Sequence, residues 1–176
     1  EGIFNTKYLR RIKVVDRYYM TYNDYGHLNR RDDEAGAALG MLIGPKSVIT
    51  FPSGGQQLPD RGFYEVSGLA WSGGGAISRV EISTDGGRRW EDAEIQGTAH
   101  PMSHTRFSYQ WTWDGQETEL LSRSTDDTGQ VQPTRAQIAE FFGERVDDES
   151  FRVRGMDNSV QPWRIASDGS VHNAIT

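Results

Sequence analysis

Four aromatic residues alternate with three polar ones in the stretch Phe107-Ser108-Tyr109-Gln110-Trp111-Thr112-Trp113. Successive side chains of a β-strand point to opposite faces of its sheet, so this period of two indicates a strand with one apolar face. Large aromatic rings also pack well on a pleated surface. We therefore predict a strand whose aromatic face is buried against another part of the protein.

Further short strands are predicted on both sides of this stretch, at 46–50, 62–71, 76–84, 90–95 and 118–125. Turn-forming residues separate them, as in Pro52 to Gly55 and in the Asp85-Gly86-Gly87 hairpin. Six or seven short strands at intervals of about 8–12 residues are typical of an antiparallel β-sandwich. The sequence thus predicts an all-β fold between about Lys46 and Pro133.

The two ends of the chain follow other patterns. Residues 16–44 show neither the period of two of a strand nor the 3.6-residue period of a helix. We interpret them as part of a long irregular N-terminal extension that lies on another part of the structure. After Pro133, a capping box of Thr134 and Gln137 predicts one short helix. Late strands are expected at 151–154 and 161–165, followed by a hairpin turn at 167–170.

The composition excludes several functions. A net charge of -6 disfavours a nucleic-acid partner, because a polyanion is bound by neutralising its phosphates. No apolar run reaches the roughly 20 residues of a membrane helix, and we find no signal-peptide pattern at Glu1, so we expect a soluble chain. The absence of Cys excludes disulfides, Cys-ligated metals and a Cys nucleophile.

Four motifs resemble functional sites, and we interpret the first as a solvated loop and the other three as structural turns. His100 and His104 have a metal-ligand spacing only on a helix, which Pro101 opposes. The loop 72–75 is rich in Gly but opens into a strand, whereas phosphate loops open into a helix. The acids at 126–127 lack the other ligands of a calcium loop. The stretch 83–90 fits the Asp-box hairpin, in which Asp85 closes the turn and Trp90 covers it.

Three stretches in order, 64–75, 77–94 and 126–133, are similar to the dimerisation domain of sulfite-oxidase-type molybdenum enzymes. Residues 6–12 resemble the segment that ends the preceding molybdopterin domain in that family, which implies that residues 1–45 are the end of that domain and a linker, and 46–176 the dimerisation domain. The ending Trp163 to Gly169 resembles most closely the bacterial sulfite/sulfane dehydrogenase subunit of the Sox sulfur-oxidation pathway.

The resemblance implies that the sandwich is immunoglobulin-like, and it implies a homodimer, a periplasmic location and a c-type cytochrome as electron acceptor. It also implies that an upstream domain binds the molybdenum-molybdopterin cofactor through a Cys thiolate, so we expect no cofactor in this Cys-free chain alone, and no catalytic activity from it.

Two residues match site residues of the family. Lys7 corresponds to a Lys that approaches the pterin cofactor, and the alternative is a solvated Lys. Arg154 corresponds to an Arg that helps to bind the sulfur oxyanion, for which a guanidinium is suited, and the alternative is an ordinary surface Arg.

Two other functions make different demands on the sequence. A non-catalytic immunoglobulin-like binding module for carbohydrate or protein would expose Trp111 and Trp113 as a flat strip, whereas the dimerisation domain would place them in the core or the dimer seam. An autonomous hydrolase is not expected, because no Ser, His and Asp arrangement has a recognisable nucleophile turn around it.

Overall fold

A computed structural model describes residues 8–14, 16, 43–142 and 157–174. The chain divides into two compact units, Glu1–Leu42 and Ile43–Thr176. Residues 8–14 of the first unit contain neither helix nor strand, and the second unit holds every element described below. None of the described helices is long and apolar enough to cross a membrane.

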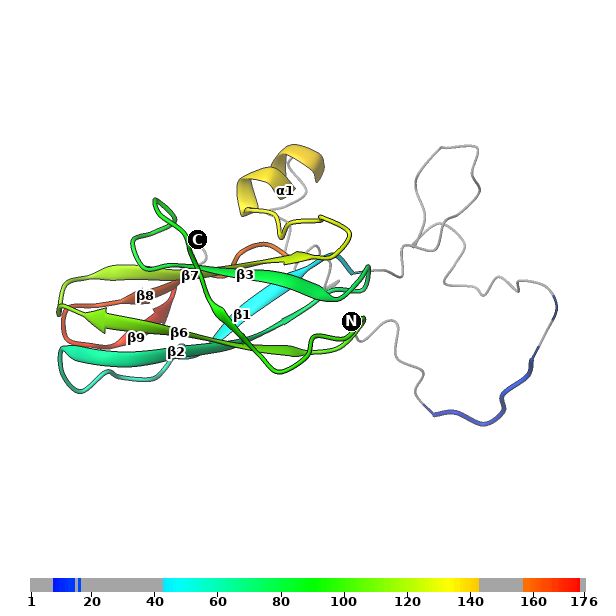
Figure 1. The fold of residues 1–176 in the computed structure, drawn as a ribbon, viewed down its shortest axis with the longest axis horizontal. Helices are drawn as coiled ribbons and strands as arrows, with labels where there is room; N and C mark the ends of the chain where they lie inside the picture. The colour runs from blue at the N-terminus through cyan, green and yellow to red at the C-terminus, as the bar shows by residue number, and fades with distance from the viewer. Residues whose placement is uncertain (1–7, 15, 17–42, 143–156, 175–176) are drawn as a thin grey trace. The chain divides into compact units, whose positions relative to one another are not determined.

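The second unit is an antiparallel β-sandwich (Figure 1). The first sheet has the order β1-β2-β6-β5 and contains β1 (Lys46–Phe51), β2 (Gly62–Trp71), β6 (Thr105–Trp113) and β5 (Glu94–Gln96). The second sheet has the order β4-β3-β7-β8-β9 and contains β4 (Glu91–Asp92), β3 (Ile77–Ser83), β7 (Thr118–Asp126), β8 (Trp163–Ile165) and β9 (Val171–Asn173). The helix α1 (Arg135–Phe142) follows β7. The all-β prediction, with one short helix, is confirmed.

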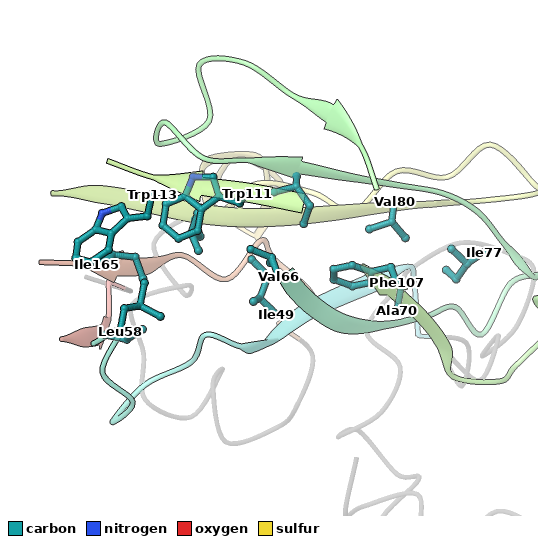
Figure 2. Packing of buried hydrophobic residues seen from close by; sticks show 13 residues of the cluster. Ile49, Leu58, Val66, Ala70, Ile77, Val80, Phe107, Trp111, Trp113 and Ile165 are labelled. Atoms are coloured by element: carbon teal, nitrogen blue, oxygen red, sulfur yellow. The ribbon is translucent and has the colours of Figure 1, made fainter. Parts of the chain in front are cut away.

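The core lies between the two sheets (Figure 2). Phe107, Trp111 and Trp113 from β6 are 0%, 8% and 4% exposed, so the aromatic face of this strand is buried as predicted. The same alternation on β2 turns Val66 and Ala70 inward. The second sheet contributes the opposite half of the core, with Val80, Ile82, Leu120 and Ile165.

The predicted helix start and final hairpin are confirmed in detail. The backbone N–H of Thr134 donates to Oε1 of Gln137 at 2.8 Å, and the Gln137 N–H donates to Oγ1 of Thr134 at 3.3 Å, which is a reciprocal capping box. Strands β8 and β9 pair across the turn at 167–170, where Gly169 has a φ of 83° that favours glycine. The strand expected at 151–154 lies outside the described residues.

The prediction of one strand over 90–95 is wrong. The segment forms two short strands in different sheets, since β4 pairs with β3 and β5 pairs with β6. Ala93 stands between them, and its N–H still donates to the Val80 carbonyl at 2.9 Å. The chain crosses from one sheet to the other here, and Ile95 then packs against the core from the first sheet.

Candidate functional site

The two residues assigned to the site by resemblance, Lys7 and Arg154, lie outside the described residues. Their roles therefore stay predictions. The described residue closest to Arg154 in sequence is Asp157, which lies in a polar cluster beside the start of β1. We call this set the junction cluster, and it consists of Lys46, Ser47, Gln132, Arg135, Asp157, Asn158 and Ser159.

Asp157 and its neighbour are held by two contacts to the start of β1 and one to α1. The Lys46 ammonium donates to the Asp157 carbonyl at 2.6 Å, and the Asn158 side-chain amide donates to the Pro45 carbonyl at 3.1 Å. The Arg135 guanidinium lies 3.5 Å from the Asp157 carboxylate. Residues far apart in sequence are thereby joined where the chain enters β1.

The Asp157 carboxylate is stabilised in its charged form. Burial opposes ionisation, but the hydroxyl and backbone N–H of Ser159, with the charges of Lys46 and Arg135, outweigh that effect and lower the pKa of Asp157. The Ser159 N–H donates to the carboxylate at 2.9 Å. Asp157 is therefore an anionic anchor at neutral pH and is unsuited to act as a general acid there.

The side-chain amide of Gln132, which is 2% exposed, is the centre of the cluster. Its oxygen accepts hydrogen bonds from the N–H and the hydroxyl of Ser47, at 2.8 and 2.7 Å, and from the N–H of Ser124 at 3.2 Å. Its nitrogen donates to the Ser159 carbonyl at 3.1 Å. One buried amide thus connects β1, β7 and the segment that follows residue 156. A buried network of this kind fixes one geometry, because each unpaired member would be costly.

The Gly-rich loop at 72–75 is structural, as predicted. The Ser72 hydroxyl donates at 2.7 Å to Asp126, which is 1% exposed and also accepts the backbone N–H groups of Thr128 and Gln130. Burial alone would disfavour the charged carboxylate, but these hydrogen bonds keep the pKa of Asp126 lowered. A Cβ on Gly75 would collide with Asp127, so the glycine allows this loop to pack on the acidic turn.

The Asp-box prediction is confirmed. Asp85 Oδ1 accepts the backbone N–H groups of Arg88 at 3.0 Å and Arg89 at 2.9 Å. These bonds, led by that from Arg89, lower the pKa of Asp85 to about 2. The Trp90 indole N–H donates to the Gly87 carbonyl at 3.1 Å, which fastens the ring over the turn.

The structure reveals an ion-pair cluster that sequence reasoning missed. Glu81 is 5% exposed on the outer side of β3, and the Arg123 guanidinium binds both its carboxylate oxygens at 2.7 and 2.9 Å. Arg79 adds a third contact at 3.2 Å and also pairs with Asp92. The Trp90 ring covers the Arg123 guanidinium at 4.2 Å from its centroid. The register of β3 and β7 brings Glu81 opposite Arg123, and a single sequence gives no signal for that pairing.

The described residues do not fit a metal centre. His100 and His104 are exposed, in agreement with the prediction of a solvated loop, and the His104 ring lies edge-on to Trp71 at 5.3 Å. No group of three or more His, Asp or Glu side chains able to hold a metal occurs in the described ranges. The whole chain also has no Cys, so it offers no thiolate donor to a metal.

Comparison with known proteins gives consistent matches. The profile of the Mo-co oxidoreductase dimerisation domain family matches residues 41–156. Mitochondrial sulfite oxidase of Rattus norvegicus is 30% identical over 157 residues, which cover 75% of this chain and 27% of that protein. Nitrate reductase (NADH) 1 of Arabidopsis thaliana is 33% identical over 135 residues, which cover 67% of this chain and 14% of that protein.

A solved structure agrees with these matches. The sulfane dehydrogenase SoxCD from Paracoccus pantotrophus is 40% identical, with a TM-score of 0.68, and the match covers 76% of this chain and 33% of that one. The chain therefore spans about a quarter of the length of the curated sulfite oxidase and a third of the solved chain.

Proposed function

Since the chain belongs to the Mo-co oxidoreductase dimerisation domain family, we propose that it is the C-terminal dimerisation portion of a molybdenum-dependent sulfite or sulfane dehydrogenase. The observation that carries this proposal is the 40% identity to the sulfane dehydrogenase SoxCD over 76% of the chain. Identity to sulfite oxidase and to nitrate reductase is lower, at 30% and 33%. Oxidation of an inorganic sulfur compound is thus favoured over nitrate reduction.

In this proposal, the cofactor is held elsewhere in the protein. The Cys-free chain offers no thiolate to molybdenum. By the family resemblance, residues 1–45 would end a molybdopterin-binding domain that binds the metal, and residues 46–176 would form the dimer. The homodimer, the c-type cytochrome acceptor and the periplasmic location belong to the proposal as well, and they rest on the family resemblance.

Two residues of this chain would reach that centre. Lys7 would place a compact cation beside an anionic group of the pterin cofactor. Arg154 would bind the sulfur oxyanion with its planar fork of N–H donors. The junction cluster would contribute by anchoring the chain three residues after Arg154, where Lys46 and Gln132 hold the segment from Asp157 to Ser159.

The alternative of a carbohydrate-binding or protein-binding module has no support. That function needs Trp111 and Trp113 on an open surface, and the two rings are 8% and 4% exposed in the core. The aromatic pair stabilises the sandwich and offers no platform to a ligand.

The experiment is to express the complete protein encoded at this locus and measure its molybdenum content and its reduction of a c-type cytochrome. We expect about one molybdenum per chain and electron transfer that depends on sulfite or thiosulfate. The variant Arg154→Gln should raise KM for the sulfur substrate, whereas the control Arg152→Gln should not. A protein that holds no molybdenum, or that reduces nitrate and oxidises no sulfur compound, would refute the proposed function.

A further inference from the structure

The outer face of the β1-β2-β6-β5 sheet carries apolar side chains on the side opposite the core. Alternation along β2 turns Phe63, Glu65, Ser67, Leu69 and Trp71 outward, because the residues between them face the core. Phe63 is 64% exposed. We call this surface the open face.

Neighbouring strands extend the apolar surface. Val48 on β1 is the register partner of Leu69, and both side chains are half-buried. The β-bulge between Ile49 and Phe51 brings Phe51, which is 38% exposed, into register with Ser67. Exposed apolar side chains gathered on one face of a sheet are typical of an interaction site.

Two opposite charges, on β2 and β6 of the open face, have no ion-pair partner among the described residues. Glu65 and Arg106 are exposed, and within the described part of the chain neither makes an ion pair or a side-chain hydrogen bond. Glu65 is in register with Gln110, four residues along β6 from Arg106. Four residues of a strand span about 13 Å, so the two charges cannot pair within one chain.

The order of residues along β2 and β6 on the open face is self-complementary. The row of Ser67 and Ser108 lies at its centre and continues to the exposed Glu94 on the edge strand β5, with the row of Glu65 on one side and the row of Leu69 and Arg106 on the other. Phe63 and Trp71 lie one row further out at the two ends. A rotation of 180° about an axis along the central row exchanges the two sides, as an isologous interface requires.

We propose that two copies of this chain pair face to face through the open face, about a twofold axis lying along the row of Ser67 and Ser108. Phe63 of each copy then packs over Trp71 of the other, and Glu65 of each pairs with Arg106 of the other. The small Ser67 side chains at the centre allow the sheets to approach to the usual spacing of about 10 Å. This inference rests on the proposed function, because the family match names a dimerisation domain.

Charge exchange tests the axis. Glu65→Arg places two Arg side chains together at each of the two contacts, and Arg106→Glu places two Glu side chains together. Each single variant should raise the dimer dissociation constant, measured by sedimentation equilibrium, by about tenfold or more, since like charges at an interface are strongly unfavourable. The double variant restores opposite charges and should return to within about threefold of the wild-type constant.

An apolar substitution tests the face independently. Phe63→Asp should abolish the dimer, whereas Val131→Asp, at a side chain that is 53% exposed outside the open face, should leave the dissociation constant unchanged. Circular dichroism of each variant establishes that the sandwich is intact.

The possible failures are distinct. A wild-type chain that stays monomeric up to its solubility limit would refute the dimer itself, and with it that part of the proposed function. A wild-type dimer that keeps its dissociation constant in Phe63→Asp and in both single charge variants would refute the open face and leave the proposed function intact. A dimer that is lost in Phe63→Asp but indifferent to charge exchange would overturn the proposed axis.

Discussion

The outer faces of the two sheets differ in whether their charged side chains form ion pairs. On the β4-β3-β7-β8-β9 sheet, Glu81 is paired with Arg123 and Arg79, and Trp90 covers the pair. On the open face of the other sheet, Glu65 and Arg106 have no ion-pair partner within the described residues, and Phe63 is exposed.

This difference separates stability from association. A buried charge that loses its partner destabilises the fold, because the remaining charge stays desolvated. An exposed charge without a partner costs the monomer little and is free to pair with a second copy. Substitutions on the β4-β3-β7-β8-β9 sheet, which we call the charged sheet, should therefore change the free energy of unfolding. Substitutions on the open face should change the dissociation constant of the dimer.

The largest effect is expected at Arg123. The variant Arg123→Leu removes two hydrogen bonds from Glu81 and should lower the free energy of unfolding by about 3 kcal/mol in urea titration. The control Arg164→Leu removes an exposed pair with Glu119 and should cost less than about 1 kcal/mol. Equal losses in the two variants would show that burial of Glu81 does not set the stability of this sheet.

A second substitution compares the two faces of one strand. Gly68 faces the core, where an added Cβ would meet the Phe107 ring and the Val48 carbonyl, so Gly68→Ala should cost about 2 kcal/mol of unfolding free energy. Ser67→Ala, on the open face, should stay within about 0.5 kcal/mol of the wild type. Thermal unfolding of both variants at one protein concentration measures the difference, and a larger loss in Ser67→Ala would contradict the assignment of the faces.

Acid should weaken the Asp-box hairpin. The pKa of Asp85 is lowered to about 2 in the folded chain, first by the Arg89 backbone N–H, from an ordinary value of 3.8. The stabilisation is therefore complete above pH 3.8 and is lost as the pH falls through about 2. Between pH 5 and pH 2, Asp85→Asn should lose less stability than the wild type. A pH profile of Asp85→Asn parallel to that of the wild type would contradict the prediction.

The smallest effect is the response of the dimer to salt. Raising the ionic strength screens the proposed pairs of Glu65 and Arg106, so the dissociation constant should rise by about twofold to threefold. In Arg106→Glu the sign should reverse, because salt then screens a repulsion. Sedimentation at two salt concentrations measures both, and a response of the same sign in the two proteins would argue against this pair.

Much of the fold was predictable from local patterns. The alternation in β6, the length of β2 and the capping box of α1 follow from periodicity and turn chemistry, and the structure agrees with them. The division of 90–95 between two sheets was not predictable, because both halves have the same extended pattern and only tertiary pairing assigns each to its sheet.

The candidate site was less accessible to sequence reasoning. Lys7 and Arg154 came from resemblance and remain predictions. The contacts of Gln132 join residues up to 85 positions apart, and the pairing of Glu81 with Arg123 depends on strand register, so neither leaves a local signal. The outward side of β2 does carry a local signal in the sequence, because Phe63, Leu69 and Trp71 make this strand apolar on both sides.

The most direct test of the open face uses the absence of Cys in the chain. The variant Ser67→Cys places one thiol beside the proposed axis, where two copies would present their thiols to each other across the interface. A short bismaleimide should convert most of this protein to a covalent dimer, whereas Ser78→Cys, on the charged sheet, should stay monomeric under the same treatment. Efficient cross-linking of Ser78→Cys, with none of Ser67→Cys, would contradict the account.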